Sequence, residues 1–174
     1  MPKAYVYTRF GGPEGEAFID LPKPAPGPGE LLIAVRAAGV NPVDWKLRTG
    51  YTRPGSTPKP LPTVFGSEAS GVVEQVGEGV RGFAVGDAVF GSTLTGGYAE
   101  YTLLPAAITA HKPDAVSFTD AAALPVAGAT AYDGIQQLAL PAGSRNAHHV
   151  HRARSDVLNP DPTCASRRRP GASV

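Results

Sequence analysis

At 174 residues, the chain is long enough for one well-buried domain and short for two. Its apolar fraction of 42% is ordinary, but 21 glycines and 18 prolines argue against a helical bundle and favour short strands joined by many turns. Cys164 is the only cysteine, which excludes an intramolecular disulfide and a cysteine-rich zinc site and is typical of a reducing compartment.

Neither the N-terminal residues nor any later stretch suggests export or membrane insertion. The first 16 residues lack an apolar segment of signal-peptide length, and no run of about 18 apolar residues occurs. We therefore expect a soluble, cytoplasmic protein with no membrane partner.

The formal net charge of +1 hides two unlike parts of the chain. Residues 1–144 carry a net charge of −3, whereas residues 145–174 carry +4 and contain neither an aromatic residue nor a lysine. Three of the four histidines also lie in the last 30 residues. This tail does not match the body in composition.

Short segments of strand-forming residues follow one another through the first 105 residues. The richest in Leu, Ile and Val is Glu30–Val40. The others are Lys3–Thr8, Phe18–Pro22, Ser70–Gly77, Asp87–Ser92 and Gly96–Leu104. Proline and glycine prevent regular pairing over residues 22–30 and 51–62, which we expect to be surface connections.

Helices are expected at three places. Asn41–Gly50 is predicted to turn once or twice, with a proline at the first helical position. Ser117–Asp120 combines an N-cap serine with an acid three positions later, and Ala127–Leu140 is a second helical stretch despite its glycines. These elements predict a mainly β fold, a small barrel or sandwich over residues 1–115, followed by a helical connector over residues 116–144.

One group of glycines has the spacing of a dinucleotide-binding loop. Gly77, Gly79 and Gly82 form a literal G-x-G-x-x-G, the spacing that holds a dinucleotide pyrophosphate. That loop works only where a strand enters the glycines and a helix begins at them, so that helix amides meet the phosphates. A strand precedes Gly77, but a Gly-Asp pair four residues after Gly82 leads into another β-prone run. We predict a turn between two strands.

Taken in order, these segments resemble the medium-chain dehydrogenase/reductase superfamily, and within it the zinc-independent quinone oxidoreductase branch. The matching motifs run over residues 3–144 and include YTRFGGPE, PGPGELLIAVRAAGVNPVDWKLRTG, GSEASGVVEQVGEGVRGFAVGDAVFG and GGYAEYTLLPAAITAHKPDAVSFTDAAALPVAGATAYDGI. The resemblance implies a GroES-like catalytic domain with a partly open β-barrel, in which Gly77–Asp87 is a strand-joining turn.

The resemblance also implies an activity, the transfer of a hydride from NADPH to a quinone or conjugated carbonyl. In this branch the substrate oxygen is polarised by hydrogen bonds instead of by a metal, so the protein supplies orientation and electrostatics. The implied partner is a small quinone or enone and not a nucleic acid, and homo-oligomerisation is left open.

Zinc-dependent members of the superfamily carry a cysteine where this chain has Asn41 and a histidine where it has Ser67. An amide and a hydroxyl do not compete with Cys and His as Zn²⁺ ligands, so we expect no zinc. The structural-zinc loop of four cysteines is missing as well. Asp44 and Glu68 are either leftover ligands or, as we favour, solvated or hydrogen-bonding acids.

The resemblance carries three site residues onto this sequence. Asn41 matches an asparagine near the nicotinamide and the substrate, where its amide can donate to a carbonyl oxygen, or it is a local cap on the following helical turn. Tyr51 falls near tyrosines that line the substrate pocket, or it packs for area alone. Thr130 matches a position near the nicotinamide ribose, or it is a helix-face hydroxyl. Asn41 and Tyr51 are thus candidate catalytic residues, and Asn41 and Thr130 candidate cofactor contacts.

Two further residues attract structural interpretations. Trp45 is expected in the core or in the pocket wall. His111 is the only histidine of the body, and a structural or exposed role at a strand end is favoured over a proton shuttle.

The resemblance stops at residue 144. A family member continues into an apolar strand and a glycine-rich turn that open the Rossmann domain, whereas residues 145–174 have no apolar strand and one glycine. We interpret them as a disordered product of out-of-frame translation of a GC-rich gene, or of an equivalent truncation. The rival interpretation is a genuine basic tail that meets nucleic acid or an acidic partner.

Two functions therefore stay open, and with them whether the chain is an enzyme. One is an NADPH-dependent quinone or enone oxidoreductase, and the other is a truncated, non-catalytic GroES-like fragment unable to bind the cofactor. Without a nucleotide-binding domain to cover them, the helices over residues 117–140 are expected to expose apolar faces.

The out-of-frame interpretation can be checked on the coding DNA. One of the other two frames, translated from codon 145, is expected to show an apolar strand followed by a glycine-rich loop. The same frames translated over codons 1–144 serve as the background. If neither frame shows the pattern, the interpretation is wrong.

Overall fold

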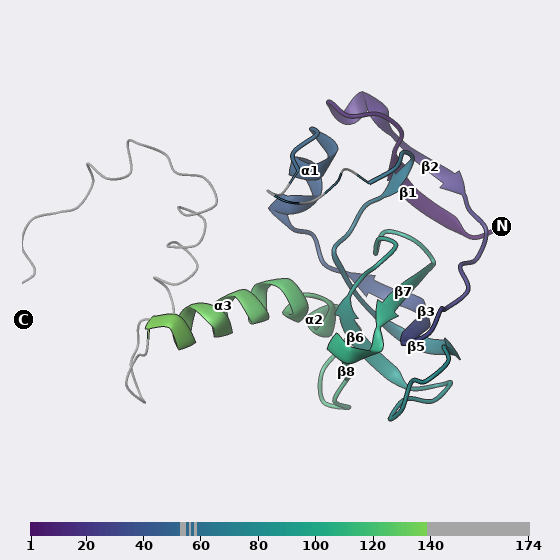
Figure 1. Ribbon diagram of the computed structural model, residues 1–174, viewed down its shortest axis with the longest axis vertical. Coiled ribbons are helices and arrows are strands. Elements are labelled where there is room, and N and C mark those ends of the chain that lie inside the picture. The colour runs from purple at the N-terminus through teal and green to yellow at the C-terminus, as the bar shows by residue number, and fades with distance from the viewer. Residues whose placement is uncertain (53–54, 56, 58, 139–174) are drawn as a thin grey trace, which may run out of the picture. The chain divides into compact units, whose positions relative to one another are not determined.

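The computed structural model describes residues 1–52, 55, 57 and 59–138 (Figure 1). The end of the predicted connector, the predicted tail at 145–174 and four residues of the predicted 51–62 loop lie outside the described residues, and what is predicted for them stays a prediction. The chain forms two units, Met1–Val126 and a second that begins at Ala127.

Two antiparallel sheets contain all the strands of the described residues. The smaller has the order β2-β1-β4 and consists of β1 (Lys3–Tyr7), β2 (Glu16–Asp20) and β4 (Thr63–Val64). The larger has the order β7-β3-β5-β6-β8 and consists of β3 (Glu30–Ala38), β5 (Glu68–Val76), β6 (Ala88–Ser92), β7 (Tyr101–Pro105) and β8 (Thr109–His111). Every strand pairing is antiparallel. The predicted mainly β class is confirmed, and this part of the chain holds no parallel, Rossmann-type sheet.

Short helices lie between the strands, and the longest helix follows them (Figure 1). They are the 3-10 turns η1 (Pro13–Gly15) and η2 (Ala106–Ile108) and the helices α1 (Pro42–Arg48), α2 (Phe118–Ala122) and α3 (Leu124–Leu138). The predicted helix starts are confirmed: Pro42 opens α1, and Ser117 Oγ accepts the backbone N–H of Asp120 at 3.0 Å at the start of α2. No helix that the structure describes is both long and apolar enough to cross a bilayer.

The hydrophobic core is centred on β3 and β5. Leu31 and Ile33 of β3 are fully buried with Ala69 and Val73 of β5. β3 pairs with β5 on one side and with β7 on the other, where Leu31 lies opposite Leu104. Alternate residues of a strand point to the same face of a sheet, so the Leu-x-Ile pattern of β3 supplies one continuous apolar surface.

Aromatic rings join the two sheets. Phe65, which follows β4, stacks on Tyr5 of β1 at a centroid distance of 5.5 Å and on Tyr98, which precedes β7, at 6.0 Å. Tyr7 meets the same ring edge-on at 5.0 Å. The backbone N–H of Tyr5 also donates to the carbonyl of Tyr98 at 2.7 Å. Such ring pairs add about 0.5–1.5 kcal/mol each beyond buried area, so this cluster holds the small sheet against the large one.

Some strand boundaries differ from the predicted ones. β7 begins at Tyr101 instead of Gly96, because Gly96 has a φ of +96° and a Cβ there would lie 2.6 Å from Val64. The sequence does not predict β4 as a strand, because two residues carry no periodic pattern. β4 is defined by its pairing with β1, in which Val64 lies opposite Val6.

The G-x-G-x-x-G segment is a turn between two strands, as predicted. β5 ends at Val76, β6 begins at Ala88, and the fully described residues between them form no helix. Gly79 and Gly82 have φ values of +75° and +81°, which suit tight turns. The N–H of Gly77 donates to the carbonyl of Glu30 at 2.8 Å, so it is already used within the barrel.

The expected exposure of the late helices is wrong for α2. This helix packs against β3, β5 and β6, its residues Ala121 and Ala122 are buried, and its Phe118 carbonyl accepts the hydroxyl of Ser70 at 2.6 Å. The barrel itself thus provides the surface that covers α2. The expectation holds for α3, where Leu124 and Tyr132 are 45% and 63% exposed.

Truncation of a core residue tests the role of the β3 surface. Leu31→Ala is expected to lower the free energy of unfolding by about 2–5 kcal/mol, because Leu31 is fully buried between β5 and β7. Leu94→Ala, at a residue that is 41% exposed, is the control and is expected to cost less than about 1 kcal/mol. Urea unfolding measures both values, and equal losses would contradict this description of the core.

Candidate functional site

The start of α1 places two of the site residues. Asn41 is the N-cap residue of α1, and its backbone N–H donates to Asp44 Oδ2 at 2.8 Å. The backbone N–H of Asp44 donates in turn to the carbonyl of Asn41 at 3.0 Å. The Asp44 carboxylate in the first turn thus accepts the backbone N–H of the N-cap residue, which would otherwise have no partner. This contact holds the start of the short helix in a fixed geometry.

Asp44 is buried, with 6% of its surface exposed. Its Oδ1 accepts the hydroxyl of Ser67 at 2.9 Å, and its Oδ2 accepts the hydroxyl of Tyr98 at 3.3 Å. No salt bridge among the described residues involves Asp44. The buried carboxylate is therefore stabilised by three hydrogen-bond donors that carry no charge.

Glu68 is a second buried acid, with 2% of its surface exposed. Its Oε1 accepts the side-chain amide of Asn41 at 2.6 Å, and its Oε2 accepts the backbone N–H of Val126 at 2.7 Å. A Cβ at Gly39 would overlap Glu68 Oε1, so a larger residue there would displace this carboxylate.

Both buried acids affect the pKa of the Tyr98 phenol. Burial raises the pKa of its phenol above the ordinary value, the charge and the hydrogen bond of Asp44 raise the pKa further, and the charge of Glu68 adds to them. Tyr98 is therefore a neutral hydrogen-bond donor to Asp44 over the whole physiological pH range.

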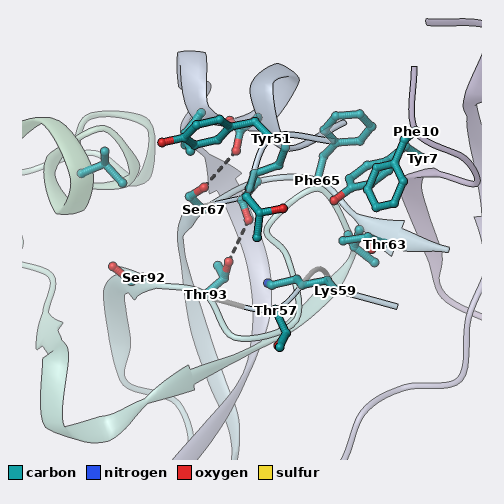
Figure 2. Close-up of a pocket in the computed structure, with 17 residues that line it drawn as sticks. Tyr7, Phe10, Tyr51, Thr57, Lys59, Thr63, Phe65, Ser67, Ser92 and Thr93 are labelled. Atoms are coloured by element: carbon teal, nitrogen blue, oxygen red, sulfur yellow. Dashed lines mark hydrogen bonds between the residues drawn. The ribbon is translucent and has the colours of Figure 1, made fainter. Parts of the chain in front are cut away.

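A cavity of about 360 Å³ lies beside this network (Figure 2). It is lined by Tyr7, Phe10, Val43, Asp44, Leu47, Tyr51, Thr52, Thr57, Lys59, Thr63, Val64, Phe65, Gly66, Ser67, Ser92, Thr93 and Val126. Figure 2 shows Tyr7, Phe10 and Phe65 at one side of the view and Tyr51 and Ser67 at the other. The lining combines aromatic and aliphatic side chains with hydroxyl groups, which is common in small-molecule sites.

Some hydroxyl groups of the cavity wall already donate hydrogen bonds within the protein, and others are available to a ligand. Ser67 donates to Asp44, and Thr93 donates to the carbonyl of Gly66 at 2.8 Å. Tyr51 is 44% exposed, and its hydroxyl has no hydrogen-bond partner among the residues that the structure describes. Among the described residues, the phenols of Tyr51 and of the buried Tyr7 both line the cavity without a hydrogen-bond partner, and Tyr51 is the more exposed of the two.

The structure places the three predicted site residues differently. Tyr51 lines the cavity. Asn41 is outside the lining but is joined to it through Asp44 and through Glu68. Thr130 belongs to the part of α3 in the second unit, so its predicted position near a nicotinamide ribose stays a prediction.

The predicted place of Trp45 is wrong. Trp45 is 52% exposed and lies outside both the core and the cavity lining. On α1 the cavity side is occupied by Val43, Asp44 and Leu47, and at 3.6 residues per turn Trp45 falls on the opposite side.

His111 takes the predicted exposed place at a strand end. It is the last residue of β8, its ring stacks on Phe83 at 4.6 Å, and its Nε2 lies 2.8 Å from the carbonyl oxygen of Gly82. These contacts hold the turn between β5 and β6 and involve no cavity residue.

Both acids have the hydrogen-bonding role that we favour, although they are buried instead of solvated. No group of three or more His, Cys, Asp or Glu side chains that could hold a metal ion occurs in the described part of the chain. Tyr98 is the site residue that the sequence does not reveal, because 54 positions separate it from Asp44 and only the sheets bring them together.

Comparisons with known proteins agree with this geometry. The family model of the alcohol dehydrogenase GroES-like domain matches residues 27–114. The chain belongs to this family. Its relatives are quinone oxidoreductases of the medium-chain dehydrogenase/reductase superfamily, so the resemblance seen in the sequence motifs is confirmed.

Two curated relatives of this GroES-like chain illustrate the match. The quinone-oxidoreductase QR1, chloroplastic, of Triphysaria versicolor is 38% identical over 141 residues, which cover 79% of this chain and 43% of the relative. The quinone oxidoreductase of Rattus norvegicus is 44% identical over 128 residues, 71% of this chain and 37% of the relative. The chain thus spans less than half the length of these relatives.

A solved structure adds the fold. A mycobacterial protein complexed with NADPH is 40% identical, with a TM-score of 0.71 over 79% of this chain and 41% of that protein. Because one relative is named as chloroplastic, family membership does not decide the compartment, and the cytoplasmic location stays a prediction.

Alkaline stability tests the Asp44–Tyr98 contact. The folded state raises the pKa of Tyr98, so its contribution to stability is full below the unfolded pKa of about 10 and is lost as the pH rises further. Tyr98→Phe keeps the ring on Phe65 but removes the ionising group. The free energy of unfolding is expected to fall less steeply above pH 10 in this variant than in the wild type.

Urea unfolding at pH 7, 9, 10 and 11 measures the slope. Tyr132→Phe, at a residue that is 63% exposed, is the matched control and is expected to follow the wild type. Parallel slopes for Tyr98→Phe and the wild type would show that Tyr98 is not held by the buried acids.

Proposed function

We propose that this chain provides the substrate-binding half of an NADPH-dependent quinone or enone reductase. The observation that carries the proposal is the 360 Å³ cavity, in which a free Tyr51 phenol lies across from an aromatic wall. The quinone oxidoreductases among the relatives support the substrate class, and the NADPH complex of a mycobacterial relative supports the cofactor.

In the proposed reduction, the protein stabilises the negative charge that develops on the substrate oxygen. Reduction of a quinone or enone adds a hydride to carbon, and NADPH supplies that hydride when bound. Negative charge then accumulates on the substrate oxygen, where placed donors lower the barrier. In the proposal Tyr51 donates to this oxygen, and Asn41 lies near both substrate and nicotinamide, whose ribose Thr130 contacts.

We also propose that the site works without zinc. The amide of Asn41 and the hydroxyl of Ser67 replace the usual cysteine and histidine, and both donate hydrogen bonds to acids instead of offering lone pairs to a cation. Asp44 and Glu68 are in turn satisfied by N–H and O–H donors. These hydrogen bonds support the polarisation of a carbonyl group by hydrogen-bond donors instead of by a metal. The proposal also places the protein in a reducing, cytoplasmic compartment, as its single cysteine suggests.

A second function is favoured by one observation. The only G-x-G-x-x-G of the chain is a turn, and the described residues contain no parallel βαβ unit that could hold a dinucleotide. On this alternative the chain is a non-catalytic module that binds the small molecule but not the cofactor.

Two titrations of the purified chain separate these functions. 1,4-Naphthoquinone is expected to bind saturably and to shift the backbone NMR resonances of Tyr51, Ser67 and Thr93, which line the cavity. Tyr51→Phe is expected to weaken the binding by about 3- to 10-fold, because one hydrogen bond to the quinone oxygen is lost. Nicotinamide fluorescence follows NADPH, and saturable micromolar binding would contradict the non-catalytic alternative.

Controls isolate the carbonyl contact. Naphthalene has the same ring and no oxygen, so its affinity is expected to be equal in the wild type and in Tyr51→Phe. Tyr132→Phe changes an exposed tyrosine of the second unit and is expected to leave naphthoquinone binding unchanged. Failure of naphthoquinone to bind the wild type saturably would overturn the proposed substrate class.

A further inference from the structure

Glu68 makes two contacts that the proposed chemistry does not use directly. One carboxylate oxygen accepts the side-chain amide of Asn41 at 2.6 Å, and the other accepts the backbone N–H of Val126 at 2.7 Å. Asn41 precedes α1, whereas Val126 lies in the first turn of α3 and lines the cavity. A single buried side chain therefore joins two segments that are 85 positions apart in the sequence.

The contact with Glu68 decides which way the Asn41 amide faces. A carboxylate only accepts hydrogen bonds, so Nδ2 of Asn41 must point to Glu68 and its Oδ1 must point elsewhere. A flipped amide would set oxygen against oxygen in a buried place. The second Nδ2 hydrogen then keeps a fixed direction and is not used by Glu68.

The contact with Val126 fixes the start of α3. The first N–H groups of a helix have no partner within the helix, and a negative charge at this end is favourable. Glu68 supplies both a partner and a charge to the N–H of Val126. The cavity wall at Val126 is thus held by the same carboxylate that orients Asn41.

We infer that Glu68 is a positioning residue: its buried carboxylate sets the direction of the Asn41 amide and the place of Val126 in the cavity wall at the same time. The inference rests on the proposed function for its effect on quinone binding. It assigns Glu68 a role other than that of a leftover metal ligand, because both of its oxygens already accept hydrogen bonds.

Exchanging donors and acceptors tests the inference. In Glu68→Gln, the side chain has one acceptor oxygen and one donor nitrogen. If the oxygen keeps the N–H of Val126, the nitrogen faces Asn41, whose amide must then flip or lose its partner. In the double variant Glu68→Gln with Asn41→Asp, the new amide donates to residue 41 while its oxygen still accepts from Val126. Both contacts return, but residue 41 now has no donor for a ligand.

Titration of the full chain with 1,4-naphthoquinone gives the readout. Glu68→Gln is expected to weaken binding by about 3- to 10-fold in the wild type and by less than about 2-fold in an Asn41→Ala background. The double exchange is expected to melt within a few degrees of the wild type and to bind as weakly as Asn41→Ala. Equal effects of Glu68→Gln in both backgrounds would overturn the inference, because Glu68 would then act without Asn41.

An NMR measurement separates this inference from the proposed function. One of the two Nδ2 protons of Asn41 is expected to be protected from exchange in the ligand-free wild type, and neither in Glu68→Gln. If this pattern appears and naphthoquinone does not bind the wild type, the proposed function fails while the orientation by Glu68 stands. If both protons exchange equally fast in the wild type, the inference itself is wrong.

Discussion

The antiparallel pairing of β3 with β5 brings together the groups that make up the site. The last residue of β3, Ala38, lies opposite Ala69, so the chain leaves β3 beside the point where it enters β5. Asn41 follows one end and Glu68 begins the other, and their side chains meet at 2.6 Å. A slip of one residue would turn Glu68 to the other face of the sheet and break this contact. Gly71 of β5 helps to hold the register, because a Cβ there would collide with the carbonyl of Ala34.

The second constraint is the burial of two acids. Removing a carboxylate from water is costly unless donors replace the water, and Asp44 and Glu68 together accept five hydrogen bonds from neutral groups. Asn41 and Ser67 provide two of these donors with their side chains. Asn41 and Ser67 stand where zinc-dependent members of the superfamily have zinc ligands, and here they donate hydrogen bonds to the two acids. This supports our proposal of a site that polarises carbonyls by hydrogen bonds.

The cavity depends on the contact between the two sheets. Phe65 packs between Tyr5, Tyr7 and Tyr98, and this cluster places an aromatic wall next to the buried acids. Membership of the alcohol dehydrogenase GroES-like domain family agrees with this two-sheet fold. The chain spans less than half of its relatives, so hydride transfer at this cavity remains the proposal that the binding experiments address.

Local physical chemistry let the sequence determine most elements of this protein. A run of Leu, Ile and Val predicts β3, and valines among small and polar residues predict β5. The Asn-Pro and Ser-x-x-Asp patterns predict the starts of α1 and α2, and the flanks of Gly77–Gly82 predict a turn instead of a phosphate loop. The motifs also indicate the family, whereas for Tyr51 they leave open a place in a pocket wall or packing for area alone. Only the tertiary structure decided that Tyr98 meets Asp44, that Glu68 holds Val126 and that Trp45 faces outward. The first two contacts join residues 54 and 58 positions apart, and sheet register, not local sequence, sets such distances. The side of α1 that faces the cavity is likewise set by the packing around it.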